Sequence, residues 1–219
     1  MPLFMDVHQQ VEDAAARDVA RVTTDSQREL SLTAESRASC EAVYDTLVDA
    51  GTHLEWAGRG QPTYFRLLSF EAPDGRLTVG ASFSSTGSIP GTGRQFHDRS
   101  RVVVAEPPTL FEFITESTVP GRNPMQATFR HRYELEPNGD GCRIRYTFRQ
   151  ESIVNPMLRL SLPIVRDLSW KFGMPMMMRG GLRNLVRAAE QSALGRSRRS
   201  AAAPRRSRGG SNRRTNTTR

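Results

Sequence analysis

His131 offers the most chemistry of any residue in this sequence. It lies in the segment QATFRHRYELE, residues 126–136, and strand alternation places Tyr133 on the same side of the chain. Tyr146 has the matching phase in the next alternating segment, CRIRYTFRQE. A neutral imidazole beside tyrosine hydroxyls can polarise a ligand carbonyl or act as a general base. His131 is therefore a candidate for contact with a ligand.

A structural role explains the same pattern for His131. Its ring would then share a hydrogen bond with Asp98, Ser100 or a water molecule, because an unpaired buried nitrogen costs about 1–3 kcal/mol. Asp98 and Ser100 lie two residues apart in QFHDRSRVVVAE, and a shift of one residue would turn both toward solvent. Both interpretations of His131 stay open.

Patterns that mark metal sites, phosphate loops and serine nucleophiles are missing from the sequence. His8, His53 and His97 lack the mutual spacing of a metal site, and the two cysteines are far apart without a CxxC motif. The loop GTGR is followed by neither a helix nor a phosphate-binding Lys, and no G-x-S-x-G elbow occurs. We expect no metal and no cofactor, and no residue is assigned as catalytic.

Alternation of apolar and polar residues predicts the elements that hold these side chains. The period is two from Gln61 to Ile153, with one apolar and one polar face, as in an antiparallel sheet covered on one side. The turn APDG predicts a hairpin, and GSIPGTGR predicts a loop. The predicted strands are 28–36, 63–71, 76–84, 95–106, 110–116, 126–136 and 142–151.

Helices are predicted where the period changes. Ser39 is a suitable N-cap for a helix over CEAVYDTLVDA, and THLEWAG predicts a second short helix. The apolar segment 154–193 must cover the sheet, but its prolines forbid one straight helix, so we expect a broken connector and then a helix from about Pro175. Its stripe of Met178, Leu182, Leu185 and Ala189 should pack on the sheet.

The strand phases define a set of side chains that face the covered side. Most of them fit ordinary core packing equally well, and the methionines fit core, an adaptable pocket roof, or an exposed patch for a partner or membrane surface. The residues expected to line a cavity are Trp56, Phe96, Asp98, Ser100, Phe111, Phe113, Phe129, His131, Tyr133, Tyr146, Phe148, Met174, Met177 and Met178.

Charge is concentrated at one end of the chain. Nine of the 31 basic residues lie in 195–219, so the remaining 22 nearly balance the 23 acidic residues. We expect residues 1–27 to be a partly helical extension, 28–193 to be the folded domain, and 194–219 to be a disordered Arg-rich tail. The tail is a solubilising extension or makes weak contacts with polyanions; specific nucleic-acid binding is not expected.

No uncharged apolar run approaches the roughly 20 residues that cross a bilayer. The first residues lack the basic start and long apolar core of a signal peptide. Two unpaired cysteines suit a reducing compartment. We therefore expect a cytoplasmic protein without a transmembrane segment.

Six phrases follow one another in a telling order: SCEAVYDTLVD, HLEWAG, VGASFS, VVVAEPPTLFEF, YELEPNGDGCRIRYTFRQE and GLRNLVRAAEQ. Together they resemble the START-like superfamily, also called SRPBCC, in its polyketide cyclase/dehydrase and lipid-transport branch, over about residues 28–192. The resemblance implies an α+β helix-grip fold: a seven-stranded antiparallel sheet curved around a long C-terminal helix, with two short helices after the first strand. Members of the superfamily hold a hydrophobic cavity between sheet and helix.

The resemblance implies a class of ligand and no particular reaction. We expect binding, extending to transport, of a hydrophobic small molecule such as a lipid or polyketide in an internal cavity. One alternative is a cyclase or dehydratase that acts on an aromatic or polyketide substrate through His131 with Tyr133 or Tyr146. Another is association of the tail with nucleic acid or an anionic membrane.

Overall fold

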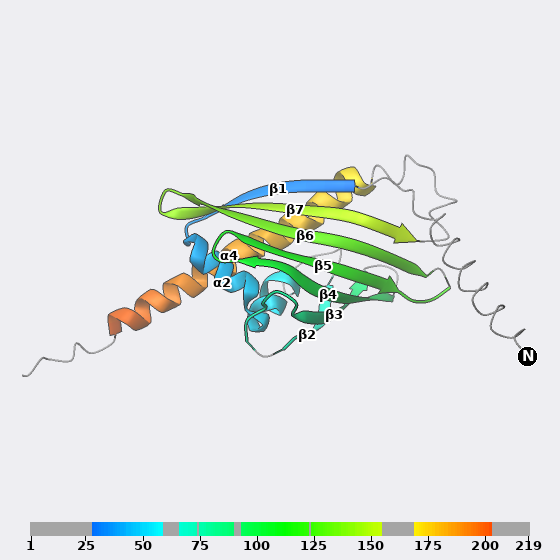
Figure 1. The fold of residues 1–219 in the computed structure, drawn as a ribbon, viewed down its shortest axis with the longest axis horizontal. Helices are drawn as coiled ribbons and strands as arrows, with labels where there is room; N and C mark the ends of the chain where they lie inside the picture. The colour runs from blue at the N-terminus through cyan, green and yellow to red at the C-terminus, as the bar shows by residue number, and fades with distance from the viewer. Residues whose placement is uncertain are drawn as a thin grey trace, which may run out of the picture.

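The computed structural model describes residues 28–58, 66–73, 75–89, 93–122, 124–154 and 169–202. The predicted N-terminal extension, the predicted connector at 155–168 and residues 203–219 of the predicted tail lie outside the described residues. Figure 1 shows a curved sheet with the long C-terminal helix running across one of its faces.

Seven strands form one antiparallel sheet in the order β1-β7-β6-β5-β4-β3-β2, so the first and last strands are neighbours (Figure 1). This confirms the predicted seven-stranded helix-grip architecture. The strands are β1 (Arg28–Ser36), β2 (Arg66–Glu71), β3 (Ser82–Ile89), β4 (Arg94–Glu106), β5 (Leu110–Val119), β6 (Met125–Asn138) and β7 (Gly141–Val154).

The hairpin of β6 and β7 sets the register of the inner face. Asn138 pairs with Gly141, which leaves a two-residue loop with Gly139 at a φ of 58°. Such a loop needs positive φ values, which Gly adopts without strain. The register that follows places His131 opposite Phe148 and Tyr133 opposite Tyr146.

Two short helical segments follow β1. Helix α2 (Cys40–Val48) begins at Ser39, whose hydroxyl accepts a hydrogen bond from the Ala42 amide at 3.4 Å. A 3-10 turn, η1 (Ala50–Thr52), and a π turn, η2 (Leu54–Gly58), complete the connection. The predicted N-cap and both predicted helical segments are therefore present.

The antiparallel pairing predicted for residues 63–71 and 76–84 is present between β2 and β3, but the predicted tight turn APDG and the start of the second strand are wrong. β2 ends at Glu71, but β3 begins only at Ser82 and continues through Ile89, into the predicted loop. The intervening segment folds back onto α2 instead: Leu77 is buried, and its amide donates to the Val48 carbonyl at 2.7 Å. Burial of Leu77 in the core outweighs the local alternation that predicted a strand.

Helix α4 (Met174–Ala202) follows a π turn, η4 (Ser169–Gly173). Leu182, Leu185 and Ala189 are buried, whereas Arg179 and Arg183 face solvent, as the predicted stripe requires. The helix continues to Ala202, so it extends past residue 194, where the predicted tail begins.

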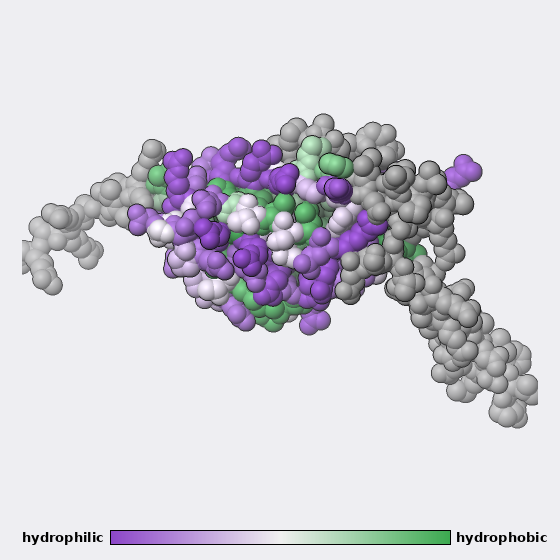
Figure 2. All heavy atoms as spheres, turned by 90° about the horizontal axis from the view of Figure 1, so that it is seen from above, coloured by the Kyte–Doolittle hydropathy of each residue, from purple (hydrophilic) through white to green (hydrophobic). Residues whose placement is uncertain are grey.

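Hydrophobic and hydrophilic patches both occur on the face seen in Figure 2. Some apolar side chains of the described residues therefore face solvent; the large exposed ones are Leu68, Val79, Phe172, Met176 and Leu194. Phe172 and Met176 belong to η4 and the first turn of α4, and they are 60% and 47% exposed. No described helix has the length and hydropathy needed to cross a membrane.

Candidate functional site

Cross-strand register arranges the predicted residues in rows on the inner face of the sheet. One row runs through Val102, Phe113, His131 and Phe148. The next row, toward the Arg94 end of β4, contains Ser100, Thr115 and Phe129. The row on the other side contains Phe111, Tyr133 and Tyr146. The strand phases expected from the sequence therefore agree with the structure. Their role in ligand contact stays a prediction.

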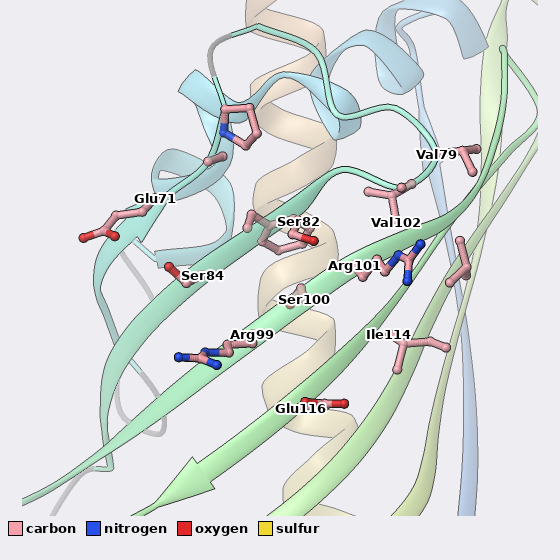
Figure 3. A pocket seen from close by; sticks show the side chains of 15 residues that line it. Glu71, Val79, Ser82, Ser84, Arg99, Ser100, Arg101, Val102, Ile114 and Glu116 are labelled. Atoms are coloured by element: carbon pink, nitrogen blue, oxygen red, sulfur yellow. The ribbon is translucent and has the colours of Figure 1, made fainter.

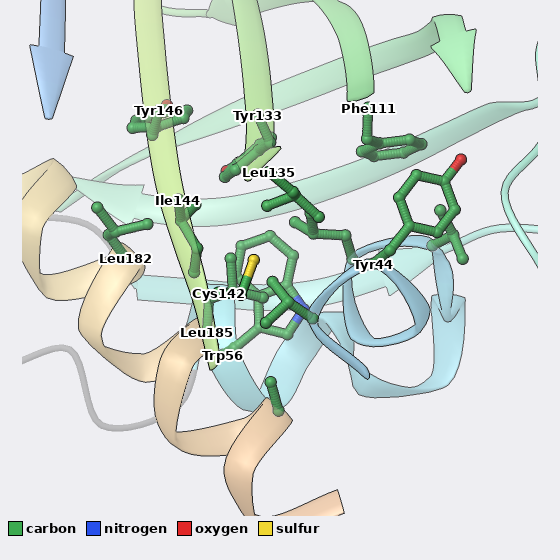
Figure 4. Packing of buried hydrophobic residues seen from close by; sticks show 14 of the residues in the cluster. Tyr44, Trp56, Phe111, Tyr133, Leu135, Cys142, Ile144, Tyr146, Leu182 and Leu185 are labelled. Carbon is green, nitrogen blue, oxygen red and sulfur yellow. The ribbon is translucent and has the colours of Figure 1, made fainter. Parts of the chain in front are cut away.

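The inner face has two halves that differ in packing. In the closed half, helices α2 and α4 lie against the sheet, and side chains interlock with at most 3% exposure (Figure 4). In the open half, η4 and the first turns of α4 face the sheet, and the side chains keep accessible surface. The closed half comprises Val43, Tyr44, Leu47, Phe111, Leu135, Cys142, Ile144, Leu185 and Ala189; the open half comprises Phe129, His131, Trp170, Met174 and Met178.

Aromatic rings surround His131 in the open half. Its ring stacks on Phe113 with centroids 4.5 Å apart and an interplanar angle of 10°. Phe148 meets the His131 ring edge to face, with the ring centroids 5.1 Å apart. Phe148 in turn stacks on Phe129 and on Trp170, at 5.1 and 5.9 Å. The predicted aromatic residues thus form one continuous surface.

His131 is linked to the helix through Tyr146. The imidazole Nδ1 lies 2.9 Å from the Tyr146 hydroxyl, which donates to Met178 Sδ at 3.4 Å. Which of the two atoms donates in the contact between Nδ1 and the Tyr146 hydroxyl depends on the tautomer of the His131 ring. No hydrogen bond to the other ring nitrogen, Nε2, occurs among the described residues.

The ionisable groups of this relay are neutral at physiological pH. Burial lowers the pKa of His131 to about 3. Burial also raises the pKa of Tyr133 and of Tyr146, whose rings stack with centroids 4.6 Å apart. His131 is consequently a weak base and the tyrosines are weak acids, so the cluster is suited to hydrogen bonding more than to proton transfer.

A second polar group lies on β3, β4 and β5 near the edge of the inner face. Ser100 and Thr115 are buried and their hydroxyls lie 2.9 Å apart. In the adjacent row, Asp98 pairs in register with Ser85 on one side and with Ser117 on the other. Asp98 thus lies between two serines on the inner face of the sheet.

Asp98 is the least satisfied member of that group. Its Oδ1 is buried and has no hydrogen-bond partner. Burial raises the pKa of Asp98 to about 6, although a hydrogen bond with Ser117 and the nearby His97 lower it. The carboxylate is thus ionised at neutral pH in a poorly solvated place.

Trp56, from η2, is buried and packs with the core residues of the closed half (Figure 4). Its ring meets Tyr133 edge to face at 6.4 Å and lies 4.4 Å from His53. His53 also stacks on Phe70 at 4.5 Å, and burial lowers the pKa of His53 to about 3. The Nδ1 of His53 and the Nε1 of Trp56 are both buried without a hydrogen-bond partner.

The remaining predicted residues occupy the margins of the site. Phe96 is buried on β4, and Met174 and Met177 are half-buried on α4. Met174 and Met178 pack against the buried core, whereas Met176 faces outward.

Several inner-face residues were missed from the sequence. Ser85 and Ser117 lie just beyond the predicted strands and continue the phases of Phe83 and Thr115, whereas Gln150 lies within the predicted strand 142–151 in phase with Phe148. The stacking of His53 on a strand residue has no such signal, because it depends on how η2 meets β2.

The opposite face of the sheet carries a groove of about 910 Å³, which is wide open to solvent (Figure 3). Arg99, Arg101, Ile114 and Glu116 line it from β4 and β5. Farther along this face, Arg130 and Arg132 both pair with Glu112, which is only 4% exposed. Arg130 and Arg132 are thus compensated by acidic side chains. The cavity that the sequence predicts is expected on the other face.

Within the described ranges, no three His, Cys, Asp or Glu side chains gather in a way that could hold a metal ion. Cys40 and Cys142 are both buried free thiols, and burial raises the pKa of Cys142.

Comparisons with known proteins agree with this geometry. The chain resembles solved structures of proteins from Rhizobium loti (22% identity, 74% of this chain and 97% of the other, TM-score 0.55) and Rhizobium leguminosarum (12%, 76% and 96%, TM-score 0.54). These likenesses show the fold. No curated protein gives a significant match. The model of the family described as "Polyketide cyclase / dehydrase and lipid transport" matches residues 27–190, and the chain therefore belongs to that family.

Proposed function

We propose that the protein binds a hydrophobic small molecule, such as a lipid or polyketide, between the open half of the sheet and the first turns of α4. Transport of the bound molecule is the extension of this role that the family suggests. A ligand there would cover apolar surface that the protein itself leaves accessible, which is favourable by about 25 cal/mol per Å².

One observation carries this proposal. His131 lies deep enough for burial to lower its pKa to about 3, yet its side chain keeps accessible surface, as do Phe129 and Met178. Depth together with accessible surface is expected of side chains that border an internal space. The closed half, built from the same sheet and helix, has no such residues among those that define it.

Native mass spectrometry of freshly purified protein tests the proposal directly. We expect an apolar compound to remain bound and to be released on unfolding. A protein that carries no such compound and also fails to bind the apolar dye phenylnaphthylamine would contradict the proposal.

A pair of tryptophan variants places the ligand. Met178→Trp replaces a flexible thioether beside Tyr146 with a bulky ring that would occupy the ligand's space. It should weaken dye binding about tenfold or more, equivalent to about 1.4 kcal/mol. Met176→Trp makes the same change on the exposed side of the helix, so it should leave dye binding within about twofold. Equal effects of the two variants would place the ligand elsewhere.

The second candidate is a cyclase or dehydratase, which the convergence of His131, Tyr133 and Tyr146 supports. The lowered pKa of His131 makes proton abstraction at neutral pH unfavourable, so we place this function second. The test is conversion of aromatic polyketide substrates by the wild type and by His131→Gln. Turnover that is lost in the variant while ligand affinity is kept would put the enzymatic function first.

A further inference from the structure

The inner face contains one carboxylate with an oxygen that no described residue engages, although Ser117 bonds the same side chain. Asp98 is the carboxylate in a row of hydroxyls formed by Ser85 and Ser117, and its buried Oδ1 accepts no hydrogen bond. Ser100 and Thr115 in the neighbouring row already share a hydrogen bond with each other. A carboxylate left in this condition gains free energy from any hydrogen-bond donor that reaches it.

Two arginines in strands of this sheet, Arg94 and Arg28, are engaged with groups other than Asp98. Arg94 on the same strand donates to the carbonyl oxygens of Val119 and Pro120, each at 3.3 Å. Arg28 lies over the Trp170 ring at 6.0 Å, on a strand separated from β4 by three others. An anionic group placed beside Asp98 would thus meet a like charge, while these two described arginines are engaged with other groups.

A second polar atom on this face lacks a partner among the described residues. The neutral ring of His131 is engaged at Nδ1 with the Tyr146 hydroxyl, and no described residue bonds its Nε2. Asp98 and His131 lie two strands and four residues apart in register, or about 16 Å along the sheet. Asp98 Oδ1 is thus an unused acceptor on the sheet, whereas the unused Nε1 of Trp56, a donor, belongs to η2 beside the closed half.

We propose that Asp98 accepts a hydrogen bond from the polar end of the bound ligand. The ligand is then an apolar molecule whose polar end is a donor without negative charge, namely an alcohol, a phenol or an amine. This inference rests on the proposed binding of a hydrophobic molecule in the open half.

Three probes with the same chain test this assignment: decanol, decylamine and decanoate, each competing with phenylnaphthylamine for the full-length protein at neutral pH. Wild type should bind decanol and decylamine about tenfold or more tightly than decanoate. Asp98→Asn should bring the three affinities within about threefold. Glu116→Gln makes the same chemical change one residue away from Ser117 on the outer face, and it should keep the wild-type ranking.

The outcomes separate this inference from the proposed function. Decanoate binding as tightly as decanol, or an unchanged ranking in Asp98→Asn, overturns the role of Asp98 while the binding function stands. Failure of every probe to bind wild type removes both. Thermal unfolding monitors the fold of each variant, and if Asp98→Asn does not fold, the wild-type ranking of the three probes decides the question.

Discussion

The closed and open halves of the inner face are made from the same strands and the same helix, yet their side chains are satisfied differently. In the closed half, Leu47, Ile144 and Leu185 are completely buried against one another. In the open half, Phe129, His131 and Met178 keep accessible surface, and on the same inner face Asp98 keeps an unpaired oxygen. We therefore expect the closed half to supply stability, and we propose that the surface left accessible in the open half serves the ligand.

Truncation in the closed half should have the largest effect on stability. Leu185→Ala removes a fully buried side chain between α4 and the sheet, and we expect a loss of about 2–5 kcal/mol. Chemical denaturation with urea measures the change. A loss under about 1 kcal/mol would mean that the closed half is not well packed.

Gly141 tests the corner where the β6–β7 hairpin meets the end of β1. A Cβ atom there would lie 2.2 Å from the Ser36 carbonyl oxygen, so one of the two backbones must move. We expect Gly141→Ala to cost about 1–3 kcal/mol, as overpacking does in cores. Gly139→Ala is the contrasting change, because nothing lies near its Cβ and only its positive φ opposes the substitution.

Acid should destabilise the protein through its buried histidines. Burial lowers the pKa of His53 and of His131 to about 3, so the unfolded chain binds more protons than the folded one between about pH 3 and the usual value of 6.5. Their contribution to stability is complete above 6.5 and is lost as the pH falls.

Asp98 acts in the opposite direction. Its folded pKa of about 6 lies above the ordinary 3.8, so its protonation stabilises the fold as the pH falls between these values. We therefore expect the urea midpoint to fall from pH 7 to pH 4 in wild type, and to fall more steeply in Asp98→Asn. If the urea midpoint of Asp98→Asn falls less with decreasing pH than that of wild type, the raised pKa of Asp98 is contradicted.

The smallest loss is expected in the open half. Met178→Ala removes a half-buried side chain, so its cost should be under about 1.5 kcal/mol, well below that of Leu185→Ala. The same variant should also reduce the rise in melting temperature that a bound ligand produces. Equal losses at the two positions would erase the distinction between the halves.

Much of the site follows from alternation and one turn. The phase of β6 and β7, with the two-residue loop at Gly139, is enough to bring His131, Tyr133 and Tyr146 together. The sequence pattern failed at residues 76–84, because the burial of Leu77 under α2 is a long-range effect that a local pattern cannot contain. The pairing of Asp98 with Ser117 likewise depends on the register of β4 with β5.

Gly180 and Gly181 lie in α4 between Met178 of the open half and the buried Leu182. Glycine lowers helix stability by about 0.5–1 kcal/mol relative to alanine, so the backbone is weakest where the helix passes from one half to the other. The turns before this pair can unwind while Leu185 and Ala189 stay in place. We expect a ligand of the proposed kind to enter or leave by transient fraying of this helix end, without unfolding of the rest of the domain.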